Sequence, residues 1–500
     1  MTKREALEQS TFGKRVAEEE TEVLSQYFVR TEQWKRLLAG DVDITYGPKG
    51  SGKSALYSLL TREFEKLRLE RRIVALPAEN LRGAPAFRDL VDDPPASEEQ
   101  FRQLWRFYFL SILADYIRLH CRATSQVDRG VEDTIRILVD AKLLHPEDRV
   151  SLKTALKRAF EFVKSRPVSF EGSVKPDFSG NPEVGAKITF GEPTSEERGN
   201  GFISSDDAFQ TLASFLERQN ITVWLTLDRL DVAFTESPLL EKRGLRALFR
   251  TYLDLLAHSR IGIKVFLRDD IWRRIVAEGF REASHITRSM TIDWDQKSLQ
   301  NLIVRRALHN SAIVNFYSVD PEEILSDARK QTEFFYRMFP AQVDIGRRQT
   351  NTLDWMLSRV TDGSQKPAPR ELIHLLQVAR DAQLKTYELG GGEPPGEALI
   401  GRGAIKDSLL EVSRARFDKT LCAEYAGLRT FWLKMEGSKS AQSLSSFSRL
   451  LGMSEEKGAV IAEQMVEAGF FVKKVEKGEV IYWVPFVYRE ALKMVQGKAD

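Results

Sequence analysis

Cysteine and histidine are scarce in this 500-residue sequence, and neither is arranged for chemistry. Cys121 and Cys422 lie far apart without a C-x-x-C spacing, and the six histidines form no group with the spacing of metal ligands. A structural metal site or a Ser/His/Asp hydrolase therefore has no support. His120 and Cys121 are adjacent at the end of an apolar helical stretch, where we expect them to pack.

Long hydrophobic runs and a strong charge of one sign are also absent. No stretch approaches the roughly twenty apolar residues of a membrane span, and the polar start MTKREALEQS is not that of a signal peptide. We therefore expect a cytoplasmic protein without membrane contact. The formal charge of +2 permits nucleic-acid binding without pointing to it. A chain of this length predicts roughly two to four domains.

A glycine-rich motif at 47–54 is the strongest signal in the chain. Apolar and polar residues alternate through 42–46 and then meet the phosphate-binding pattern G-x-x-x-x-G-K-[ST], which is matched at every position. A chance match in a glycine-bearing turn is the alternative, and the strand-like stretch before the motif and the helical stretch after it count against that. The residues of the motif are Gly47, Pro48, Lys49, Gly50, Ser51, Gly52, Lys53 and Ser54.

This motif predicts the binding of ATP with Mg²⁺. Its glycines let the backbone take positive φ, so that successive N–H groups turn toward the β-phosphate. Lys53 is expected to bridge the β- and γ-phosphates, and the Ser54 hydroxyl to ligate Mg²⁺. The helix that starts there adds the positive end of its dipole.

A second motif ends the apolar stretch 221–227. Asp228 follows it, and in a P-loop core a strand beside the phosphate loop delivers an aspartate that holds Mg²⁺ through water. The sequence D-x-L-D at 228–231 resembles the second motif of the AAA+ and STAND (NACHT) branch of P-loop ATPases. The resemblance implies that Asp231 polarises the attacking water. AAA+ members usually carry glutamate directly after the Mg²⁺ aspartate, whereas this chain has Arg229, which implies slow hydrolysis and use of ATP as a conformational switch.

Arg268 is the first of three arginines to which the resemblance assigns a role. It follows the apolar stretch 262–267, which we expect to be a strand next to the Mg²⁺ strand. AAA+ proteins present a polar sensor to the γ-phosphate at this place. A surface salt bridge with Asp269 or Asp270 is the alternative.

The other two arginines lie further along the chain. Arg288 precedes a predicted last core strand at 289–294, where AAA+ rings place a finger that reaches the ATP of a neighbouring subunit, and this implies a homo-oligomer. A solvated arginine at a strand start is the alternative. Arg370 follows a proline at a predicted helix start and is similar to the second sensor of AAA+ and initiator-type ATPases. Such a cation couples nucleotide state to domain angle, whereas an ordinary helix start has no such role.

The spacing of apolar residues predicts a helix over 5–40. A helix that enters the first strand of a P-loop core can wall the adenine pocket, and we hypothesise that Tyr27, Phe28 or Trp34 contacts the base. The solvated acidic face of an ordinary helix is the alternative.

Two further stretches lie between the motifs. Residues 85–166 read as a helical insertion whose dense aromatic stretch at 101–113 we expect to be core rather than a base-stacking platform. Residues 167–203 change to Gly, Pro and Ser with alternating apolar residues, which predicts a small hairpin or flexible loop whose role cannot be read.

The C-terminal part reads as two helices followed by a hairpin. Helical patterns at 443–451 and 457–468 precede two alternating stretches that turn at Gly478, which is the order of elements in a winged helix. A positively charged wing suits double-stranded DNA, while docking of a protein is the alternative because glutamates on the preceding helices would repel DNA. The lysines of the predicted wing are Lys473, Lys474 and Lys477.

The predicted fold class is α/β: a parallel-sheet P-loop NTPase core with a helical insertion, then a helical lid and a winged-helix-like domain. The predicted domains are 1–294, 295–389 and 400–500, with the insertion at about 85–166 and the flexible loop at about 167–203.

The predicted function is that of a Mg²⁺-dependent ATPase acting as a nucleotide-driven motor or switch that is DNA-associated or regulatory. Standalone ATPases of this build occur in bacteria, also in antiviral defence. The alternative is therefore a STAND-like signalling switch that controls a separate effector protein. No N-K-x-D or D-x-x-G motif favours a small GTPase, and no L-S-G-G-Q motif favours an ABC-type protein.

Overall fold

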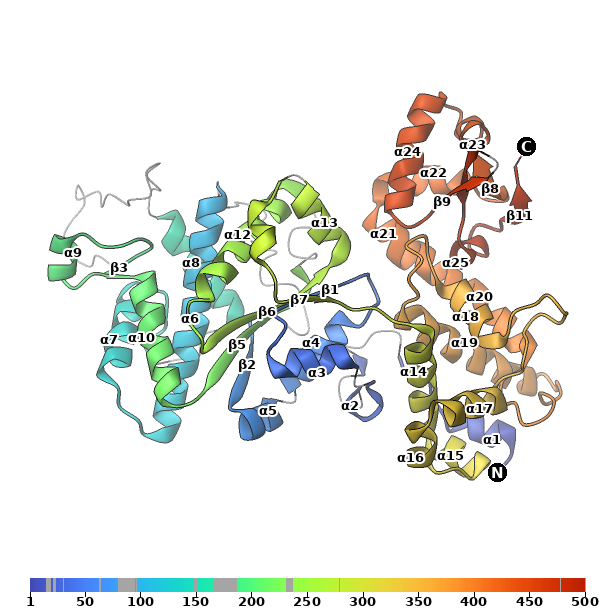
Figure 1. Cartoon of the computed structure of the whole chain (residues 1–500), viewed down its shortest axis with the longest axis horizontal. Coiled ribbons are helices and arrows are strands. Elements are labelled where there is room, and N and C mark those ends of the chain that lie inside the picture. Colours follow the sequence, from blue (N-terminus) through green and yellow to red (C-terminus); the bar gives the residue numbers. More distant parts are fainter. Residues whose placement is uncertain are drawn as a thin grey trace. The chain divides into compact units, whose positions relative to one another are not determined.

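A computed structural model describes most of the chain as two compact units. Unit 1 comprises residues 1–31, 48–52 and 293–500, and unit 2 comprises residues 32–47 and 53–292. Their helices and strands are labelled in Figure 1. The described residues are 1–14, 19–20, 24–29, 31–62, 64–79, 95, 97–147, 149, 151–165, 187–230, 237–277, 279–476 and 478–499.

Unit 2 is built on a five-stranded parallel sheet. Its strands are β1 (Ile44–Gly47), β2 (Ile73–Pro77), β5 (Thr222–Leu227), β6 (Ile261–Arg268) and β7 (Ser289–Thr291). They lie in the order β2-β5-β6-β1-β7, and every neighbouring pair is parallel (Figure 1). Parallel strands are joined by crossovers that cover both faces of the sheet. The strands are accordingly rich in apolar residues, and β1, β5 and β6 are largely buried.

The place of β1 in this sheet decides where the phosphate-binding motif lies. β1 lies between β6 and β7, and its last residue, Gly47, pairs with Arg268 of β6. The expectation that the strand ending before Asp228 lies beside the phosphate loop needs correction, because β6 separates β1 from β5. A parallel sheet that carries the motif directly after one of its central strands is the predicted P-loop NTPase core, and the fold class is confirmed.

The helices of unit 2 pack on the sheet and form the insertion. The longest, α6 (Glu98–Thr124), buries its aromatic residues: Trp105 Nε1 donates to the carbonyl of Gly244 at 2.8 Å and the Tyr108 hydroxyl to that of Ala78 at 2.8 Å. The aromatic stretch is therefore core, as predicted. The other helices are α3 (Glu32–Ala39), α4 (Lys53–Arg62), α5 (Phe64–Arg71), α7 (Arg129–Asp140), α8 (Leu152–Lys164), α9 (Ser195–Gly199), α10 (Ser205–Arg218), α12 (Pro238–Leu255), α13 (Asp269–Ala277) and the 3-10 helix η3 (Arg281–His285).

The insertion agrees with its prediction where it is described, and the segment after it does not. Helices α6, α7 and α8 fill the described part of 85–166, while 80–94 lie outside the described residues. Strands β3 (Ile188–Thr189) and β4 (Ile203–Ser204) pair in parallel with α9 between them, so the described part of 167–203 is not a hairpin. Residues 166–186 lie outside the description.

Unit 1 is mainly helical. Its first helices are α1 (Lys3–Glu8), α2 (Leu24–Tyr27), α14 (Gln296–Leu308), α15 (Ser311–Tyr317), α16 (Pro321–Ser326), α17 (Ala328–Met338), α18 (Thr352–Val360) and α19 (Pro369–Glu388). After the glycine-rich turn at 390–396 come α20 (Arg402–Arg416), the π-helical turn η4 (Phe417–Leu421), α21 (Cys422–Glu424), the 3-10 turn η5 (Ala426–Leu428) and α22 (Arg429–Leu433).

The predicted helix over 5–40 is wrong, because the structure breaks it into α1, α2 and α3. Two side chains of unit 1 bind the backbone just after α1. Asn310, the residue before α15, accepts at Oδ1 from the Thr11 N–H at 2.8 Å, and Arg306 of α14 donates from Nη1 to the Phe12 carbonyl at 2.7 Å. Gly13 then takes φ +92°, which turns the chain away from a helix. The apolar periodicity could not reveal these distant hydrogen bonds.

The C-terminal elements follow the predicted order. They are β8 (Lys439–Ser443), α23 (Leu444–Leu451), α24 (Glu455–Glu467), β9 (Val472–Glu476), β10 (Glu479–Trp483), α25 (Phe486–Arg489) and β11 (Val495–Lys498). β9 and β10 form an antiparallel hairpin that turns through Gly478 at φ +83°, in a four-stranded sheet of order β11-β8-β10-β9. The division of the chain into three domains stays a prediction.

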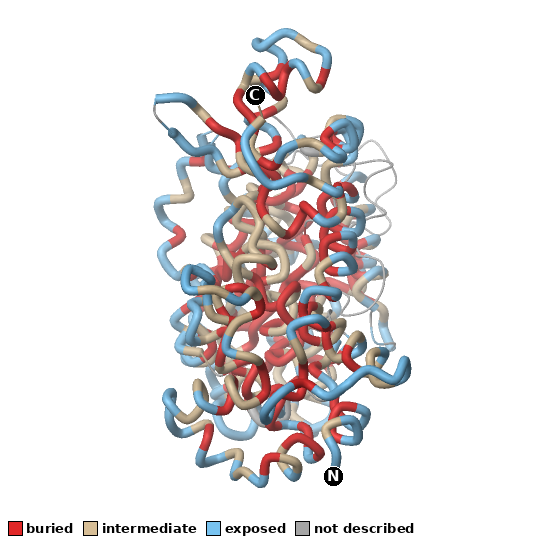
Figure 2. The backbone as a smooth tube through the Cα atoms, turned by 90° about the vertical axis from the view of Figure 1, so that its right-hand side faces the viewer, coloured by how far each residue is buried: buried red, intermediate tan, exposed pale blue. Residues whose placement is uncertain are grey.

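Buried positions recur along both units (Figure 2). Unit 2 has a hydrophobic core around its sheet, whereas unit 1 has one core among its helices up to Val412 and another from Phe417 onward. In the part of the chain that the structure describes, no helix is both long and apolar enough to cross a membrane.

Candidate nucleotide-binding site

The phosphate loop, residues 47–54, joins β1 to α4 through two glycines in the left-handed region. Gly50 has φ +84° and Gly52 has φ +99°, conformations that favour glycine. A Cβ added to Gly50 would lie 3.1 Å from the Arg370 Cβ and 3.2 Å from Glu371 Oε2, whereas one added to Gly52 would meet nothing within 4 Å. Gly50 is therefore constrained by its surroundings, and space remains in front of Gly52.

Lys53 and Ser54 open the helix after the loop. Lys53 Nζ donates to the carbonyl of Gly47 at 2.8 Å, so the amino group folds back across the loop. Ser54 is half-buried in the first turn of α4. The first N–H groups of a helix have no partner within it and favour an anion. Residues of these types in this strand–loop–helix arrangement fit the phosphates of a nucleotide and a hard cation such as Mg²⁺.

Two buried carboxylates lie at the carboxyl end of the sheet. Asp228 follows β5 and is 3% exposed, and Glu79, which comes two residues after the neighbouring strand β2, is 2% exposed. Tyr57 of α4 donates its hydroxyl to the Glu79 carbonyl at 2.9 Å. Burial raises the pKa of Tyr57, and the charges of Asp228 and Glu79 raise it further. Both carboxylates therefore lie near the helix that the phosphate loop opens.

Glu79 is a residue that sequence reasoning missed. Its position just after a predicted strand could have indicated a site residue. The sequence does not reveal, however, that this strand lies beside the strand that ends before Asp228. Because β2 pairs with β5 in parallel, both strands end at one edge of the sheet. Ligand sites of parallel α/β sheets lie at that edge.

The structure describes only part of the predicted motif at 228–231. Arg229 has φ +58°, a left-handed conformation that is costly for a side chain of this size. Such outliers cluster where a site constrains the backbone. Asp231, predicted to polarise water, lies outside the described residues, and its role stays a prediction.

Arg268 ends β6 beside Gly47 and forms a two-point ion pair. Its Nε and Nη2 donate to the two carboxylate oxygens of Asp270 at 3.0 and 2.8 Å. Burial alone would raise the pKa of Asp270, but the charge and hydrogen bonds of Arg268 outweigh it and hold the pKa below its ordinary value. The salt-bridge alternative is therefore present, and the sensor role stays a prediction.

Arg288 lies at the amino end of the sheet, where it meets a buried acid. Its Nε lies 2.9 Å from Asp43 Oδ2, and the guanidinium also donates to the carbonyl of Gly40. Asp43 accepts further hydrogen bonds from Lys264 Nζ at 2.8 Å and the Tyr252 hydroxyl at 3.0 Å. Arg288 thus has partners within its own chain, and the arginine-finger role stays a prediction.

The central residues of the phosphate loop, 48–52, belong to unit 1 and meet three of its elements. Trp294 Nε1 donates to the carbonyl of Ser51 at 2.8 Å, and Lys49 forms an ion pair with Glu424 of α21. The start of α19 lies at Gly50, with Arg370 and Glu371 closest. The predicted helix start at Pro369 is confirmed. The second-sensor role of Arg370 stays a prediction.

Glu371 and Glu424 are further residues that the sequence did not single out. Glu371 is 1% exposed and accepts from Arg416 Nη1 at 3.2 Å, while Arg416 Nη2 pairs with Asp362 at 2.5 Å. Of these two carboxylates, Glu424 pairs with a cation of the loop, Lys49. The sequence carried no signal for them, because they depend on contacts across more than 300 residues.

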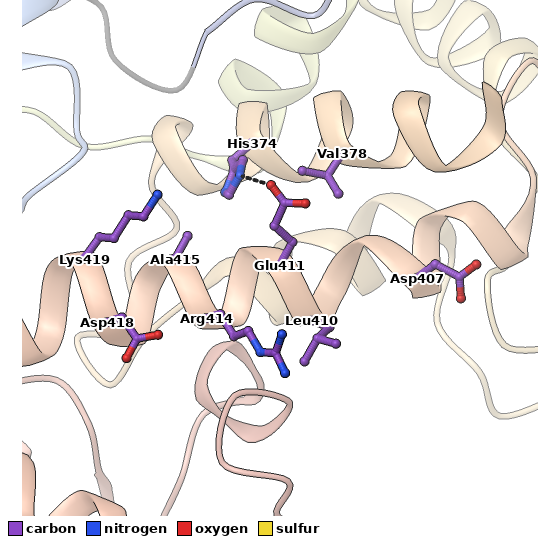
Figure 3. Close-up of a pocket in the computed structure, with 9 residues that line it drawn as sticks. All are labelled: His374, Val378, Asp407, Leu410, Glu411, Arg414, Ala415, Asp418 and Lys419. Carbon is purple, nitrogen blue, oxygen red and sulfur yellow. Dashed lines mark ion pairs between the residues drawn. The ribbon is translucent and has the colours of Figure 1, made fainter. Parts of the chain in front are cut away.

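A separate cavity of about 540 Å³ opens between α19 and α20. Figure 3 shows His374 and Val378 on α19 facing α20, with an ion-pair contact of 3.6 Å from His374 Nε2 to Glu411. Three carboxylates and two cations contribute to its lining, so its charge does not suit a triphosphate. The lining residues are His374, Val378, Asp407, Leu410, Glu411, Arg414, Ala415, Asp418 and Lys419.

The C-terminal lysines are exposed on the hairpin but are not free of contacts. Lys473 Nζ forms an ion pair with Glu463 of α24 at 2.5 Å, and Lys474 Nζ lies 4.4 Å from the centre of the Trp483 ring. Lys477 lies outside the described residues. Trp34, hypothesised to contact adenine, is 3% exposed, and that hypothesis is untested.

Comparisons with known proteins give distant likenesses only. No family model matches the chain. The chain is 24% identical over 304 residues to the putative transposon gamma-delta 80.3 kDa protein of Escherichia coli (strain K12), a match that covers 59% of this chain and 39% of that protein. This chain thus spans about two fifths of the length of that relative.

Several solved structures are similar over most of the chain, each at 12% identity. The Aeropyrum pernix ORC1 protein in complex with DNA has a TM-score of 0.36, with 93% of this chain and 92% of that one covered. The Aeropyrum pernix ORC2 protein in ADPNP-ADP complexes has a TM-score of 0.41 with the same coverage. The Walker-type ATPase paby2304 of Pyrococcus abyssi has a TM-score of 0.39, with 93% and 96% covered.

The fold assignment rests on the strand order and on the phosphate loop. The chain has a P-loop NTPase core.

Proposed function

We propose that this protein binds ATP with Mg²⁺ and hydrolyses it slowly, and that its nucleotide state controls an action at DNA. The observation that carries the ATPase part is the phosphate loop itself. Gly50 and Gly52 take the left-handed conformations of an anion cradle, and Lys53 and Ser54 open the following helix. Asp228 lies buried at the carboxyl end of the same sheet.

In this proposal each residue of the site has one task. Lys53 exchanges its hydrogen bond to the Gly47 carbonyl for the β- and γ-phosphates of ATP. Ser54 and Asp228 hold Mg²⁺, which neutralises the charge that develops on the phosphates during hydrolysis. Glu79 joins Asp231 as a candidate to orient the attacking water, since a carboxylate accepts a proton or a hydrogen bond from water at this edge of the sheet.

Unit 1 supplies the regulation in this proposal. Arg370 offers a cation to the phosphates, whereas Glu371 and Glu424 oppose an anion at the loop. A bound triphosphate would compete with Glu424 for Lys49, and α21, which carries Glu424, would respond. Arg268 and Arg288 keep their proposed roles as sensor and as finger in a homo-oligomer.

The C-terminal elements α23, α24, β9 and β10 support an action at DNA. Two helices and an exposed hairpin with lysines occur in the order of a winged helix, and such a module binds DNA through its phosphates. The relative named as a transposon protein is in line with work on DNA. The signalling switch with a separate effector in antiviral defence stays the alternative.

The decisive experiment measures ATP affinity with and without Mg²⁺ for the wild type and for Lys53→Ala. We expect tight binding only with Mg²⁺ and a loss of at least tenfold in the variant, since Lys53 carries a charge-assisted contact to the phosphates. Lys157→Ala, which removes an exposed lysine of α8, is the matched control and should bind as the wild type does. Equal affinity of the two variants would contradict the proposal.

ATP turnover with and without duplex DNA then separates the two roles. Stimulation by DNA supports the DNA-associated ATPase. Oligomerisation that depends on nucleotide and ignores DNA supports the signalling switch instead.

A further inference from the structure

The loop between α17 and α18, residues 339–351, is held in one shape by its own polar groups. Gln342 Nε2 donates to the carbonyls of Gly346 at 3.2 Å and Gln349 at 2.9 Å, which closes the loop on itself. Arg402 of α20 donates to the carbonyl of Gln342 at 2.7 Å. A loop with this many internal bonds is ordered before any partner arrives, so little entropy is lost when it binds.

A carboxylate anchors the same loop to the helices behind it. Asp344 accepts a hydrogen bond from Trp355 Nε1 at 2.6 Å and forms an ion pair with Lys406 at 2.5 Å. These two bonds and the charge of Arg359 lower the pKa of Asp344. Val343, the preceding residue, is 1% exposed in the helical core. The residues that follow Asp344 are thus directed outward on a fixed base.

The tip of this loop presents one aliphatic side chain beside two cations. Ile345 is 75% exposed, and Arg347 and Arg348 are exposed as well. Within the part of the chain that the structure describes, neither guanidinium forms a hydrogen bond or an ion pair. Burying an aliphatic side chain is favourable, so an ordered loop that displays an isoleucine offers this stabilisation to a partner.

The C-terminal hairpin carries a similar group of side chains, beside the exposed Glu476 and Glu479. Val475 of β9 is 72% exposed and follows Lys473 and Lys474 directly. Each of the two tips therefore combines one branched aliphatic side chain with two adjacent cationic residues. Both lie in unit 1.

A continuous stack of aromatic and cationic side chains joins the base of the loop to the hairpin. Successive members lie 4.4, 4.2, 4.1, 4.6 and 4.4 Å apart, measured from the cationic group to the ring centre. Cation–π contacts of this kind are attractive, and more so when the cation is desolvated. The members in order are Trp355, Arg359, Phe486, Arg489, Trp483 and Lys474.

This stack is buried at Arg489, in its middle, and it connects the loop to the hairpin. Arg489 is 6% exposed, and its burial together with the nearby charge of Arg359 lowers its pKa to about 10. Trp355, which begins the stack, also holds Asp344 of the loop. A change in the position of the hairpin would thus be transmitted to the loop.

We infer that Ile345, Arg347 and Arg348 form a second contact for double-stranded DNA, which acts together with the C-terminal hairpin. The arginines would bind phosphates or enter the minor groove, where arginine is favoured. An aliphatic side chain beside them is able to enter a base step from the minor groove and partly unstack it. This inference rests on the DNA part of the proposed function and is independent of ATP binding.

Other partners fit the tip less well. An amphipathic membrane contact needs a broad apolar face, whereas this loop displays one isoleucine. A protein hot spot places its apolar anchor in a cluster of desolvated groups, whereas Ile345 stands next to two solvated arginines. Duplex DNA fits better, because its phosphates bind cations and a single aliphatic side chain can enter one of its base steps.

The first test compares Arg347→Ala/Arg348→Ala with Arg329→Ala/Lys385→Ala, a control that removes two exposed cations from α17 and α19. The probe is a fluorescent duplex of mixed sequence, titrated at several salt concentrations. We expect the loop variant to bind roughly tenfold more weakly at low salt. Its plot of log affinity against log salt should be less steep by about 1.8, because each lost phosphate contact removes about 0.9 from the slope. The control should keep the wild-type slope.

The second test uses Ile345→Ala, with Leu389→Ala as a control that shortens another aliphatic side chain, 79% exposed. The duplex carries 2-aminopurine, whose fluorescence rises when its step unstacks. We expect Ile345→Ala to lose this rise while the salt slope stays that of the wild type. The control should retain the rise.

The outcomes separate this inference from the proposed function. Wild-type DNA binding with an unchanged salt slope in the arginine variant would overturn the inference and leave the proposed function standing. Absence of DNA binding by the wild type would overturn both DNA statements, while Mg²⁺-dependent ATP binding would still support the ATPase. Loss of binding to anionic vesicles in the same variants, with DNA affinity unchanged, would assign the tip to a membrane surface and overturn the inference.

Discussion

The two ends of the parallel sheet in unit 2 treat buried charge in opposite ways. At the amino end, Asp43 is surrounded by Lys264, Arg288 and the Tyr252 hydroxyl, so one acid meets two cations and a further donor. At the carboxyl end, Asp228 and Glu79 are two buried acids near one tyrosine. Opposite charges that satisfy one another hold a fold together, whereas like charges gathered at one edge are what a cation-binding site requires.

Lys264 shows that burial disfavours the charged groups at the amino end of the sheet. Its ammonium group is 1% exposed and also lies 4.2 Å from the centre of the Trp224 ring. Burial lowers its pKa, although Asp43 acts in the other direction. The network is therefore favourable only while all its members are present.

Removal of the central acid at the amino end should have the largest effect of the changes considered. Asp43→Ala leaves a buried lysine without its counter-ion, which costs about 3–5 kcal/mol of unfolding free energy. Urea unfolding measures this. The control is Asp133→Ala, which breaks an exposed pair with Arg136 and should change stability by less than about 1 kcal/mol. Equal stability of the two variants would mean that the amino-end network does not stabilise the fold.

At the carboxyl end, Asp228→Asn should impair function and not stability. We expect roughly a hundredfold lower Mg²⁺-dependent ATP turnover, the upper range for loss of a group that acts on a metal through water. The melting temperature should stay close to that of the wild type, because asparagine keeps the size and shape of the side chain. Full turnover together with a lower melting temperature would place Asp228 among the structural residues instead.

Glu79→Gln should have a smaller effect of the same kind. Turnover should fall about tenfold while ATP affinity is retained, because the amide still accepts a hydrogen bond from water but is a poor base. The comparison with Asp231→Asn decides which carboxylate acts on the water. If only Asp231→Asn reduces turnover, Glu79 has no catalytic part.

The smallest expected effect concerns the contact between unit 1 and its own part of the phosphate loop. Glu424→Gln neutralises the partner of Lys49 and should tighten ATP binding about threefold, as expected for a partly exposed ion pair. Isothermal titration measures the change. Glu463 of α24 pairs with Lys473 of the hairpin, away from the phosphate loop. Glu463→Gln is therefore the matched control and should leave ATP affinity unchanged.

The sequence predicted those features that depend on neighbours in the chain. The phosphate loop, the apolar strands that flank it, and the proline at the start of α19 all follow from local pattern, and the structure contains them. The strand order did not follow, because it depends on pairing between strands hundreds of residues apart. For that reason Asp228 could be proposed from sequence and its neighbour Glu79 could not.

The failed prediction of a helix over 5–40 has the same origin. Its apolar spacing was helical, but Arg306 and Glu20 form a buried ion pair at 2.9 Å that holds the broken segment. A charge pair from distant positions overrides local propensity when burial makes it strong. Likewise, Arg288 had the position of a finger in the sequence, and only the folded chain brings it to Asp43.

The π-helical turn η4 between α20 and α21 determines which residue of α21 meets the phosphate loop. A π-helical turn contains one residue more than an α-helical turn. Each residue added to a helix rotates the following residues by about 100° around the helix axis. Removing one residue from the turn would shift every later residue back by one position along the helix, so Tyr425 would come to the place where Glu424 now meets Lys49. The ion pair between α21 and the phosphate loop is thus set by the phase of a single helix, and deleting one apolar residue would break it without removing any charged group.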